Sequence, residues 1–453
     1  MSGELAVVLH THMPYVEGYG TWPFGEEWLW EAIATSYVPL LDVLDAHGDE
    51  LTLSVTPVLA DQLEIDDLGT RFDAFVTEVR RRTHAADIEA AASPAEADAL
   101  RHSLASYETA AARMRALGGD LLGALAPHVA WTSSATHAVL PLLATDAGVR
   151  LQLQAGIDSH RRRFGAWGGG FWLPECAHDP ALDLLLEEAG VHAVCVDLTD
   201  TGLDPLRPLR SAAGPLLVPI DREAIELVWS EGGYPGGAAY RDTFRRTPHD
   251  HLAHAVDGSP YDPDRARETA RADARDFVAR VRDRVAGGGL CVFAIDTELL
   301  GHWWHEGPWW LASVLDEAAD QGLPVTRLDE ALGRHEAVPA PAGLPVTTWG
   351  TPRDLTTWSA PSVADLAWSA RDAELRVIAA GPRADARAVR ELLALQSSDW
   401  AFMTYRDLSA PYAAERVAGH REALEAALSS VGSLPSAVRN LAPDASPAAL
   451  LVP

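Results

Sequence analysis

Short, continuous runs of apolar residues alternate along this chain with longer helical patterns, and this alternation limits the folds open to it. Seven such runs, each bounded by Gly, Pro or polar residues, lie at residues 5–9, 51–55, 128–133, 170–173, 193–196, 216–220 and 290–295. Because most are continuous rather than alternating, they suit strands buried on both faces of a parallel sheet. Strand and helix in alternation indicate an α/β fold, and about seven such units predict a barrel.

The remaining segments predict how the chain is divided. Residues 63–120 are rich in Ala, Arg and Glu and lack a strand signal, which predicts a helical insertion within a catalytic barrel at residues 1–335. A Pro/Ala stretch at 337–345 is typical of a linker. Beyond it we expect a C-terminal helical domain at 346–435 and a loose tail at 436–453.

The charge of the chain restricts its partners. The 453 residues carry 36 basic and 65 acidic side chains, which gives a formal net charge of −29. A surface this acidic repels phosphate backbones and anionic lipids, so we expect no nucleic-acid partner and no membrane partner. A neutral polysaccharide would not be repelled.

Cysteine content and hydropathy indicate the compartment. The three cysteines (Cys176, Cys195 and Cys291) form neither a dense disulfide framework nor a C-x-x-C pair. The first residues show no signal peptide, and no apolar stretch reaches the roughly 18 residues that a membrane span needs. We therefore expect a cytoplasmic protein.

Polar clusters follow several of the predicted strands. His10 and His12 follow the first strand, a Thr/Ser-rich segment ending at His137 follows the third, Glu175 ends the fourth and Asp296 ends the last. In parallel α/β barrels the residues at the carboxyl ends of the strands build the active site. The sequence thus predicts that these clusters meet.

Two of these residues are carboxylates in apolar, aromatic surroundings that would normally exclude a charge. Glu175 lies in Gly-Phe-Trp-Leu-Pro-Glu-Cys-Ala, and Asp296 follows Cys-Val-Phe-Ala-Ile and precedes Gly-His-Trp-Trp. Such a pair suits sugar chemistry, in which one carboxylate attacks the anomeric carbon and the other handles the proton. The alternative is that each carboxylate only caps a helix or pairs with an arginine.

The His-Thr-His segment has three interpretations. His10 and His12 share one face of a strand, so both can point into a single site. They could hydrogen-bond sugar hydroxyls, bind a metal, or be buried histidines with protein partners. Of these, we favour contact with a sugar.

Fifteen tryptophans are many for this length, and several cluster beside the two carboxylates. Any one of them could belong to the core, but Trp303, Trp349 and Trp358 are candidate platforms for pyranose rings. The glycine-rich segment 232–237 predicts a mobile loop with Tyr234 at its tip, or else an ordinary surface turn.

Four segments together resemble the motifs of glycoside hydrolase family 57, and most of all its α-1,4-glucan branching enzymes. They are Leu-His-Thr-His-Met-Pro-Tyr-Val at 9–16, Trp-Thr-Ser-Ser-Ala-Thr-His at 131–137, Phe-Trp-Leu-Pro-Glu-Cys at 171–176 and Asp-Thr-Glu-Leu-Leu-Gly-His-Trp-Trp at 296–304. Residues 229–241 are similar to the family's flexible loop, and 395–400 to a stretch of its helical domain.

The resemblance implies a distorted (β/α)7 barrel, a retaining mechanism with Glu175 as nucleophile and Asp296 as acid/base, and transfer of α-glucan chains. It implies no metal and no organic cofactor, with α-glucan as the partner and the oligomeric state left open. Its implied substrate-binding residues are His10, His12, His137, Trp172, Tyr234, His302, Trp303, Trp349, Trp358, Asp399 and Trp400.

The chain departs from the family pattern in places that bear on specificity. Residues 348–354 lack the expected Gly-Gly, the region 241–261 is short, and His178 replaces a common aromatic residue. A 4-α-glucanotransferase, an α-glucan hydrolase and a non-catalytic glucan-binding protein therefore remain alternatives. A metal-dependent polysaccharide deacetylase is a further one, because it also uses strand-end His and Asp.

Overall fold

A computed structural model describes residues 3–429, 438 and 440–451 of the chain. Within this part, the centre is a curled nine-stranded sheet whose seven parallel strands run in the order β8-β1-β2-β3-β4-β5-β7. These strands are β1 (Glu4–Thr11), β2 (Leu51–Val55), β3 (Val129–Ser133), β4 (Gly170–Trp172), β5 (Ala193–Val196), β7 (Leu216–Pro219) and β8 (Leu290–Asp296).

Each of the seven apolar runs in the sequence overlaps one of these strands. The strand residues are apolar because nearly all of them are buried. The two ends of the parallel series also meet. Asp221, two residues after β7, donates its backbone N–H to Val292 O on β8 at 2.8 Å. Beyond β7, the short strands β6 (Leu209–Arg210) and β9 (Val338–Pro339) extend the sheet. The predicted distorted (β/α)7 barrel is confirmed.

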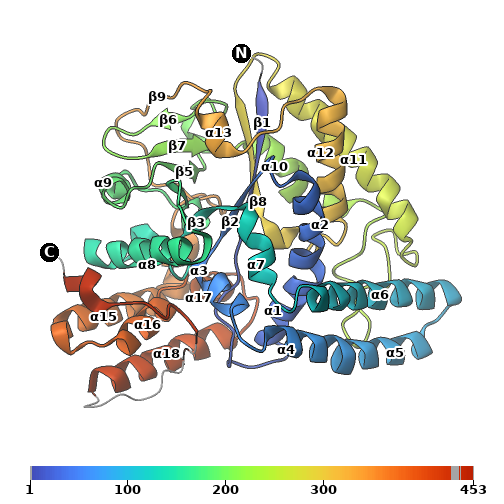
Figure 1. Cartoon of the computed structure of the whole chain (residues 1–453), viewed down its shortest axis with the longest axis horizontal. Coiled ribbons are helices and arrows are strands. Elements are labelled where there is room, and N and C mark those ends of the chain that lie inside the picture. Colours follow the sequence, from blue (N-terminus) through green and yellow to red (C-terminus); the bar gives the residue numbers. More distant parts are fainter. Residues whose placement is uncertain (1–2, 430–437, 439, 452–453) are drawn as a thin grey trace.

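Helices cover the outside of the barrel, and α11 and α12 lie side by side along one flank (Figure 1). The barrel helices are α1 (Glu26–Ala32), α2 (Val38–His47), α3 (Pro57–Leu63), α7 (Leu121–Leu125), α8 (Asp146–Phe164), α9 (Asp183–Glu188), α10 (Arg222–Trp229), α11 (Pro263–Arg284), α12 (Gly307–Gln321) and α13 (Leu328–Leu332). Among the described residues, no helix combines the length and the apolarity needed to cross a bilayer.

Residues 63–120, predicted as a helical insertion, form helices without strands in the structure. These are α4 (Leu68–Ala74), a π-helical turn (Phe75–Arg80), α5 (Arg81–Ala90) and α6 (Pro94–Ala116). Ser93 starts α6 because its hydroxyl accepts the N–H of Glu96 at 3.1 Å. The two long helices α5 and α6 pack against each other at the lower right of Figure 1.

The segment after the linker is helical and has a core of its own. Its helices are α14 (Thr356–Ser359), α15 (Ala364–Ala380), α16 (Ala386–Leu395), α17 (Ser398–Tyr405) and α18 (Tyr412–Ser429). Val377, Leu392, Trp400 and Leu424 are buried together among them. The boundaries that the sequence suggested, 1–335 and 346–435, remain predictions about domains.

The segment 436–453, predicted as a loose tail, is partly packed where the structure describes it. Val438 and Leu441 are fully buried in a cluster with Tyr15. The Ala442 N–H also donates to Asp61 Oδ2 at 2.7 Å. These apolar side chains in an Ala/Pro-rich segment cover the barrel, which composition alone did not reveal. Residues 436–437, 439 and 452–453 lie outside the described residues.

Candidate active site

Glu175 lies in a strained turn directly after β4. Its φ is 62° and that of Cys176 is 48°, in the left-handed region that residues other than glycine seldom adopt. Such a conformation costs about 1–3 kcal/mol and persists only where neighbouring groups fix it. Here the Trp349 backbone N–H donates to Glu175 O at 3.0 Å. This arrangement fixes the direction of the Glu175 side chain.

Two donors hold the Glu175 carboxylate in place. Trp349 Nε1 donates to Oε2 at 3.2 Å, and Ser398 Oγ donates to Oε1 at 3.1 Å. The side chain is 14% exposed, so part of it remains accessible. A carboxyl group that is oriented and partly open has the placement that an attacking group needs.

Asp296 ends β8 and pairs in register with His10 of the neighbouring β1. Its side chain is partly exposed. Among the described residues, no group donates a hydrogen bond to its carboxylate, in contrast to Glu175. An uncommitted carboxyl group can move toward a leaving oxygen, as an acid/base must.

Burial raises the pKa of both carboxyl groups to about 7. For Glu175 the next cause is the charge of Asp296, which indicates that the two groups share one site, while Trp349 and Ser398 act in the opposite direction. For Asp296 the next cause is the charge of Glu298. Hydrogen-bond donors favour the ionised form of Glu175, whereas the charge of His12 favours the ionised form of Asp296.

Three of the predicted histidines meet beside Glu175. His10 Nε2 and His137 Nε2 are hydrogen-bonded at 3.0 Å, and the rings of His12 and His137 stack at 3.9 Å. His137 Nδ1 is hydrogen-bonded at 2.8 Å to Ser398 Oγ, the same hydroxyl that contacts Glu175. Burial lowers the pKa of His10 and of His137 well below the usual range, so both rings are neutral.

The ring nitrogens of His10 and His12 are all engaged by protein groups. His10 contacts Ser54 Oγ at 3.3 Å and His137, while His12 contacts Thr56 Oγ1 at 3.2 Å and Asp399 at 3.1 Å. Both a metal and a sugar hydroxyl need a ring nitrogen without a partner, so this geometry favours the interpretation as buried histidines with protein partners. His12 differs from His10 and His137, because its pKa is raised. Burial lowers the pKa of His12, but the charge and the hydrogen bond of the Asp399 carboxylate outweigh burial.

Several residues predicted to bind substrate are instead buried supports. His10 and Trp172 have no exposed surface, and their rings stack at 4.6 Å. Trp400 is 1% exposed and donates its Nε1–H to Ala394 O at 2.8 Å. Sugar contact by these three side chains remains a prediction, which their burial in this structure does not favour. Trp172 meets the ring of Trp349 edge-on at 5.0 Å and so fixes the residue that contacts Glu175.

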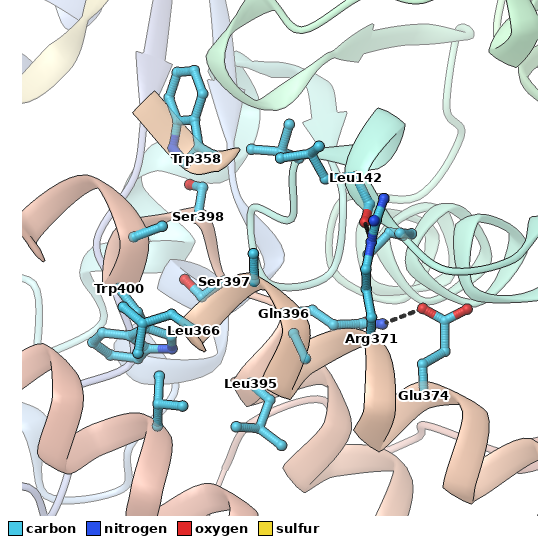
Figure 2. A pocket seen from close by; sticks show the side chains of 16 residues that line it. Leu142, Trp358, Leu366, Arg371, Glu374, Leu395, Gln396, Ser397, Ser398 and Trp400 are labelled. Atoms are coloured by element: carbon cyan, nitrogen blue, oxygen red, sulfur yellow. Dashed lines mark hydrogen bonds between the residues drawn. The ribbon is translucent and has the colours of Figure 1, made fainter. Parts of the chain in front are cut away.

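A small pocket of about 60 Å³ lies next to Ser398, and Figure 2 shows Trp358 on its lining, beside Ser398. Trp358 is 2% exposed and has no hydrogen-bond partner for its Nε1 among the described residues. Gln396 and Glu374 close another side through a hydrogen bond of 3.0 Å (Figure 2). Trp358 is thus near the site, although the pocket around it is narrow.

Among the described residues, no hydrogen bond or ring contact joins three other predicted residues to Glu175. His302 lines a large separate cavity, and Trp303 is 55% exposed. Tyr234 donates its hydroxyl to Asp276 on α11 at 2.8 Å, and its ring contacts Trp310 on α12. The hydroxyl of Tyr234 is therefore committed to the outer helices in this conformation.

Two residues around the site were missed by reasoning from the sequence. Ser398 joins Glu175 to His137, and Glu298 accepts the backbone N–H of His12 at 3.1 Å. Ser398 adjoins Asp399 in the stretch 395–400, and Glu298 lies two residues after Asp296. Their positions beside predicted site residues were the available signal.

Comparison with known proteins agrees with this geometry. The profile of glycosyl hydrolase family 57 matches residues 131–338, and that of the 1,4-alpha-glucan branching enzyme C-terminal region matches residues 368–440. A 1,4-alpha-glucan branching enzyme of Thermococcus kodakarensis is 31% identical over 93% of this chain and 72% of its own length. A probable 1,4-alpha-glucan branching enzyme of Mycobacterium tuberculosis is 33% identical over 93% of this chain and 91% of its own.

A solved structure shares the whole architecture. The crystal structure of a GH57-type branching enzyme from Pyrococcus horikoshii superimposes with a TM-score of 0.87 at 31% identity, covering 93% of this chain and 88% of that one. By sequence and by structure, the chain belongs to glycosyl hydrolase family 57.

Proposed function

We propose that this chain is a 1,4-alpha-glucan branching enzyme, which cuts an α-1,4 bond of a glucan and rejoins the chain as an α-1,6 branch. The relatives at about one-third identity carry that name. The observation that carries the chemistry is the contrast between Glu175, held by two donors, and Asp296, which no described group holds.

In the first half of the reaction, Glu175 attacks the anomeric carbon of the donor glucan and the bond to the glycosidic oxygen breaks. Asp296 gives its proton to that oxygen, and the shortened chain leaves with a free 4-hydroxyl. A glycosyl ester on Glu175 remains. Retaining chemistry of this kind needs carboxyl groups about 5–5.5 Å apart, against roughly 6.5–9.5 Å for inversion.

In the second half, Asp296 removes the proton from a 6-hydroxyl of the acceptor glucan. That oxygen attacks the anomeric carbon and the ester bond to Glu175 breaks, which restores both carboxyl groups. Water would give hydrolysis instead, so transfer requires that an acceptor be held and water be excluded. Trp349, which bonds to Glu175 and packs on Trp172, covers one side of the ester.

An α-glucan such as glycogen is the substrate class of this proposal, with action in the cytoplasm. A neutral polymer suits a chain whose formal net charge is −29.

The test is incubation of the purified protein with linear amylose. Branching produces α-1,6 linkages, detected by NMR or by debranching, with few new reducing ends. We expect Glu175→Gln and Asp296→Asn each to lower the rate by at least about 1,000-fold. New reducing ends without α-1,6 linkages would establish hydrolysis, and unchanged activity of Glu175→Gln would refute the assignment of the nucleophile.

A second measurement examines the ester itself. Asp296→Asn impairs deprotonation of the acceptor, so an activated glucosyl donor with a good leaving group should accumulate the intermediate. Mass spectrometry should then find a glycosyl adduct on the peptide that contains Glu175. An adduct on another peptide would contradict the mechanism.

A further inference from the structure

A residue outside the carboxyl pair holds the backbone of Trp349. Trp349 contacts Glu175 twice, through its backbone N–H at 3.0 Å and through its indole Nε1 at 3.2 Å. Its carbonyl oxygen accepts a hydrogen bond from Nη2 of Arg222 at 3.0 Å. Glu175 therefore fixes Trp349 on one side of its backbone, and Arg222 fixes it on the other.

Arg222 is in turn held by Asp197. Arg222 is the first residue of α10, and Asp197 directly follows β5. The Nη2 atom carries two N–H groups, and it donates to Asp197 Oδ2 as well as to Trp349 O. Thr199 donates its backbone N–H to Asp197 Oδ1 at 3.0 Å, so the carboxylate is fixed too. Since β5 pairs with β4, which precedes Glu175, these contacts join two neighbouring strand ends.

The stability of the fold does not by itself explain this ion pair. The side chain of Asp197 is fully buried and that of Arg222 is 13% exposed. The desolvation of a buried ion pair offsets much of its attraction, and neutral side chains of similar volume are often equally stable in its place. A guanidinium held by a carboxylate is, however, a charged donor with a defined direction, which makes a strong hydrogen bond to a carbonyl oxygen. The pair is thus better suited to fixing Trp349 than to stabilising the barrel.

The other contacts of the segment around Trp349 hold its two ends. Thr347 exchanges two backbone hydrogen bonds with His178, at 2.9 and 3.0 Å. Arg353 Nη1 donates to Asp200 at 3.0 Å. In the described part of the chain, only Arg222 donates to Trp349 O. Loss of Arg222 would therefore leave the segment attached at its ends and release Trp349 itself.

We infer that Asp197 and Arg222 are positioning residues, which hold Trp349 against Glu175 and so keep water away from the glycosyl ester. The part of the inference that concerns the ester rests on the proposed function. It deepens that function, because it assigns the balance between transfer and hydrolysis to a buried pair that acts through Trp349.

The first test needs no substrate. Asp197→Asn/Arg222→Met removes the donor and leaves no unpaired buried charge, so this double variant should fold. We expect the Trp349 amide to exchange its hydrogen at least about tenfold faster than in the unmodified protein, as followed by mass spectrometry. Asp61→Asn/Arg163→Met neutralises another buried pair, joined at 2.5 Å, and should leave this amide unchanged. Unchanged exchange at Trp349 in the first variant would overturn the inference.

A milder variant covers a failure to fold. Asp197→Asn keeps an acceptor for Thr199 and keeps Arg222, but it removes the charge that holds the guanidinium. The Trp349 amide should then exchange at least about threefold faster. Equal exchange in Asp197→Asn and in the unmodified protein would contradict the inference as well.

The second test separates positioning from support of the fold. Once Trp349 is released, water can reach the ester, so the double variant at 197 and 222 should form at least about threefold more new reducing ends per α-1,6 linkage on amylose. The Trp349 indole also favours the ionised form of Glu175, so its release should raise the pKa of Glu175. The acidic limb of the kcat/KM profile should then move to higher pH by about 0.5 unit or more. Asp61→Asn/Arg163→Met should change neither property.

The outcomes distinguish this inference from the proposed function. A double variant at 197 and 222 that is less stable, but keeps the product ratio and the acidic limb of the unmodified protein, contradicts the inference. An unmodified protein that forms no α-1,6 linkages contradicts the proposed function alone. The hydrogen exchange of Trp349 then still decides whether Asp197 and Arg222 hold this residue.

Discussion

Ser398 connects two polar groups that come from different strands of the barrel. Its hydroxyl donates to Glu175 Oε1 and is hydrogen-bonded to His137 Nδ1. A hydrogen bond to a charged group contributes about 1.5–3 kcal/mol, so Ser398→Ala should lower kcat on amylose roughly 10- to 100-fold with little change in KM. Ser397→Ala is the matched control, because Ser397 bonds to Asp399 rather than to Glu175. Equal losses in both variants would show that Ser398 only supports the helix.

Glu298 acts on Asp296 through its charge. After burial, that charge is the largest cause of the raised pKa of Asp296. Glu298→Gln retains an acceptor for the His12 N–H but removes the charge, so the pKa of Asp296 should fall. Asp296 then loses its proton earlier, and the alkaline limb of the kcat/KM profile should move to lower pH. Glu268→Gln, an exposed change on α11, should leave the limb in place. A limb that shifts upward would contradict this role.

At the scale of elements, the strands were predictable and the docking of the helices was not. Each barrel strand is a continuous apolar run, and that pattern is local in the sequence. The contact of α17 with the barrel includes hydrogen bonds of Ser398 to Glu175 and His137 and of Asp399 to His12, which join residues more than 200 positions apart, so Asp399 could be predicted through a motif and Ser398 was missed. Tyr234 shows the same limit, because its contact with α11 is a hydrogen bond to Asp276, which lies 42 positions further along the chain.

The segment 243–252, which forms part of the large cavity, is attached to α5 by the Asp87 carboxylate, and its His251 also contacts Thr83 at 3.2 Å and stacks on His84 at 3.5 Å. Asp87 is 3% exposed and accepts hydrogen bonds from Thr247 Oγ1, His249 Nδ1 and His251 Nδ1. Asp87→Asn should therefore release this segment. If the lost charge-assisted hydrogen bonds stabilise the closed segment by about 1.4 kcal/mol or more, the equilibrium constant for its opening should rise at least about tenfold.

Trypsin can report this opening, because it cleaves after arginine and the segment contains Arg245 and Arg246. The chain has no lysine, so arginines are its only cleavage sites. We expect faster cleavage after these residues in Asp87→Asn at low protease concentration. Asp98→Asn is a fitting control, since Asp98 on α6 is exposed and pairs only with Arg101. Equal cleavage rates in the two variants would show that Asp87 does not hold the segment.

For the whole molecule, the active site is a source of instability at neutral pH. Burial raises the pKa of Glu175 from 4.5, and of Asp296 from 3.8, to about 7, so the folded protein holds these protons more tightly than the unfolded chain does. Below about pH 4 the two carboxyl groups are protonated in the folded and in the unfolded chain, and their contribution to the free energy of unfolding is then most favourable. This contribution is lost as the pH rises through 7.

Glu175→Gln should therefore be more stable than the unmodified protein at pH 8, by roughly 2–3 kcal/mol, and this difference should vanish near pH 4. Urea unfolding at pH 4, 6 and 8 measures it. The exposed change Glu187→Gln should have no such pH dependence. If the gain at pH 8 persists unchanged at pH 4, the effect comes from packing rather than from the buried charge. A gain confined to high pH would show that the fold tolerates a destabilising carboxylate at the position where the proposed chemistry requires one.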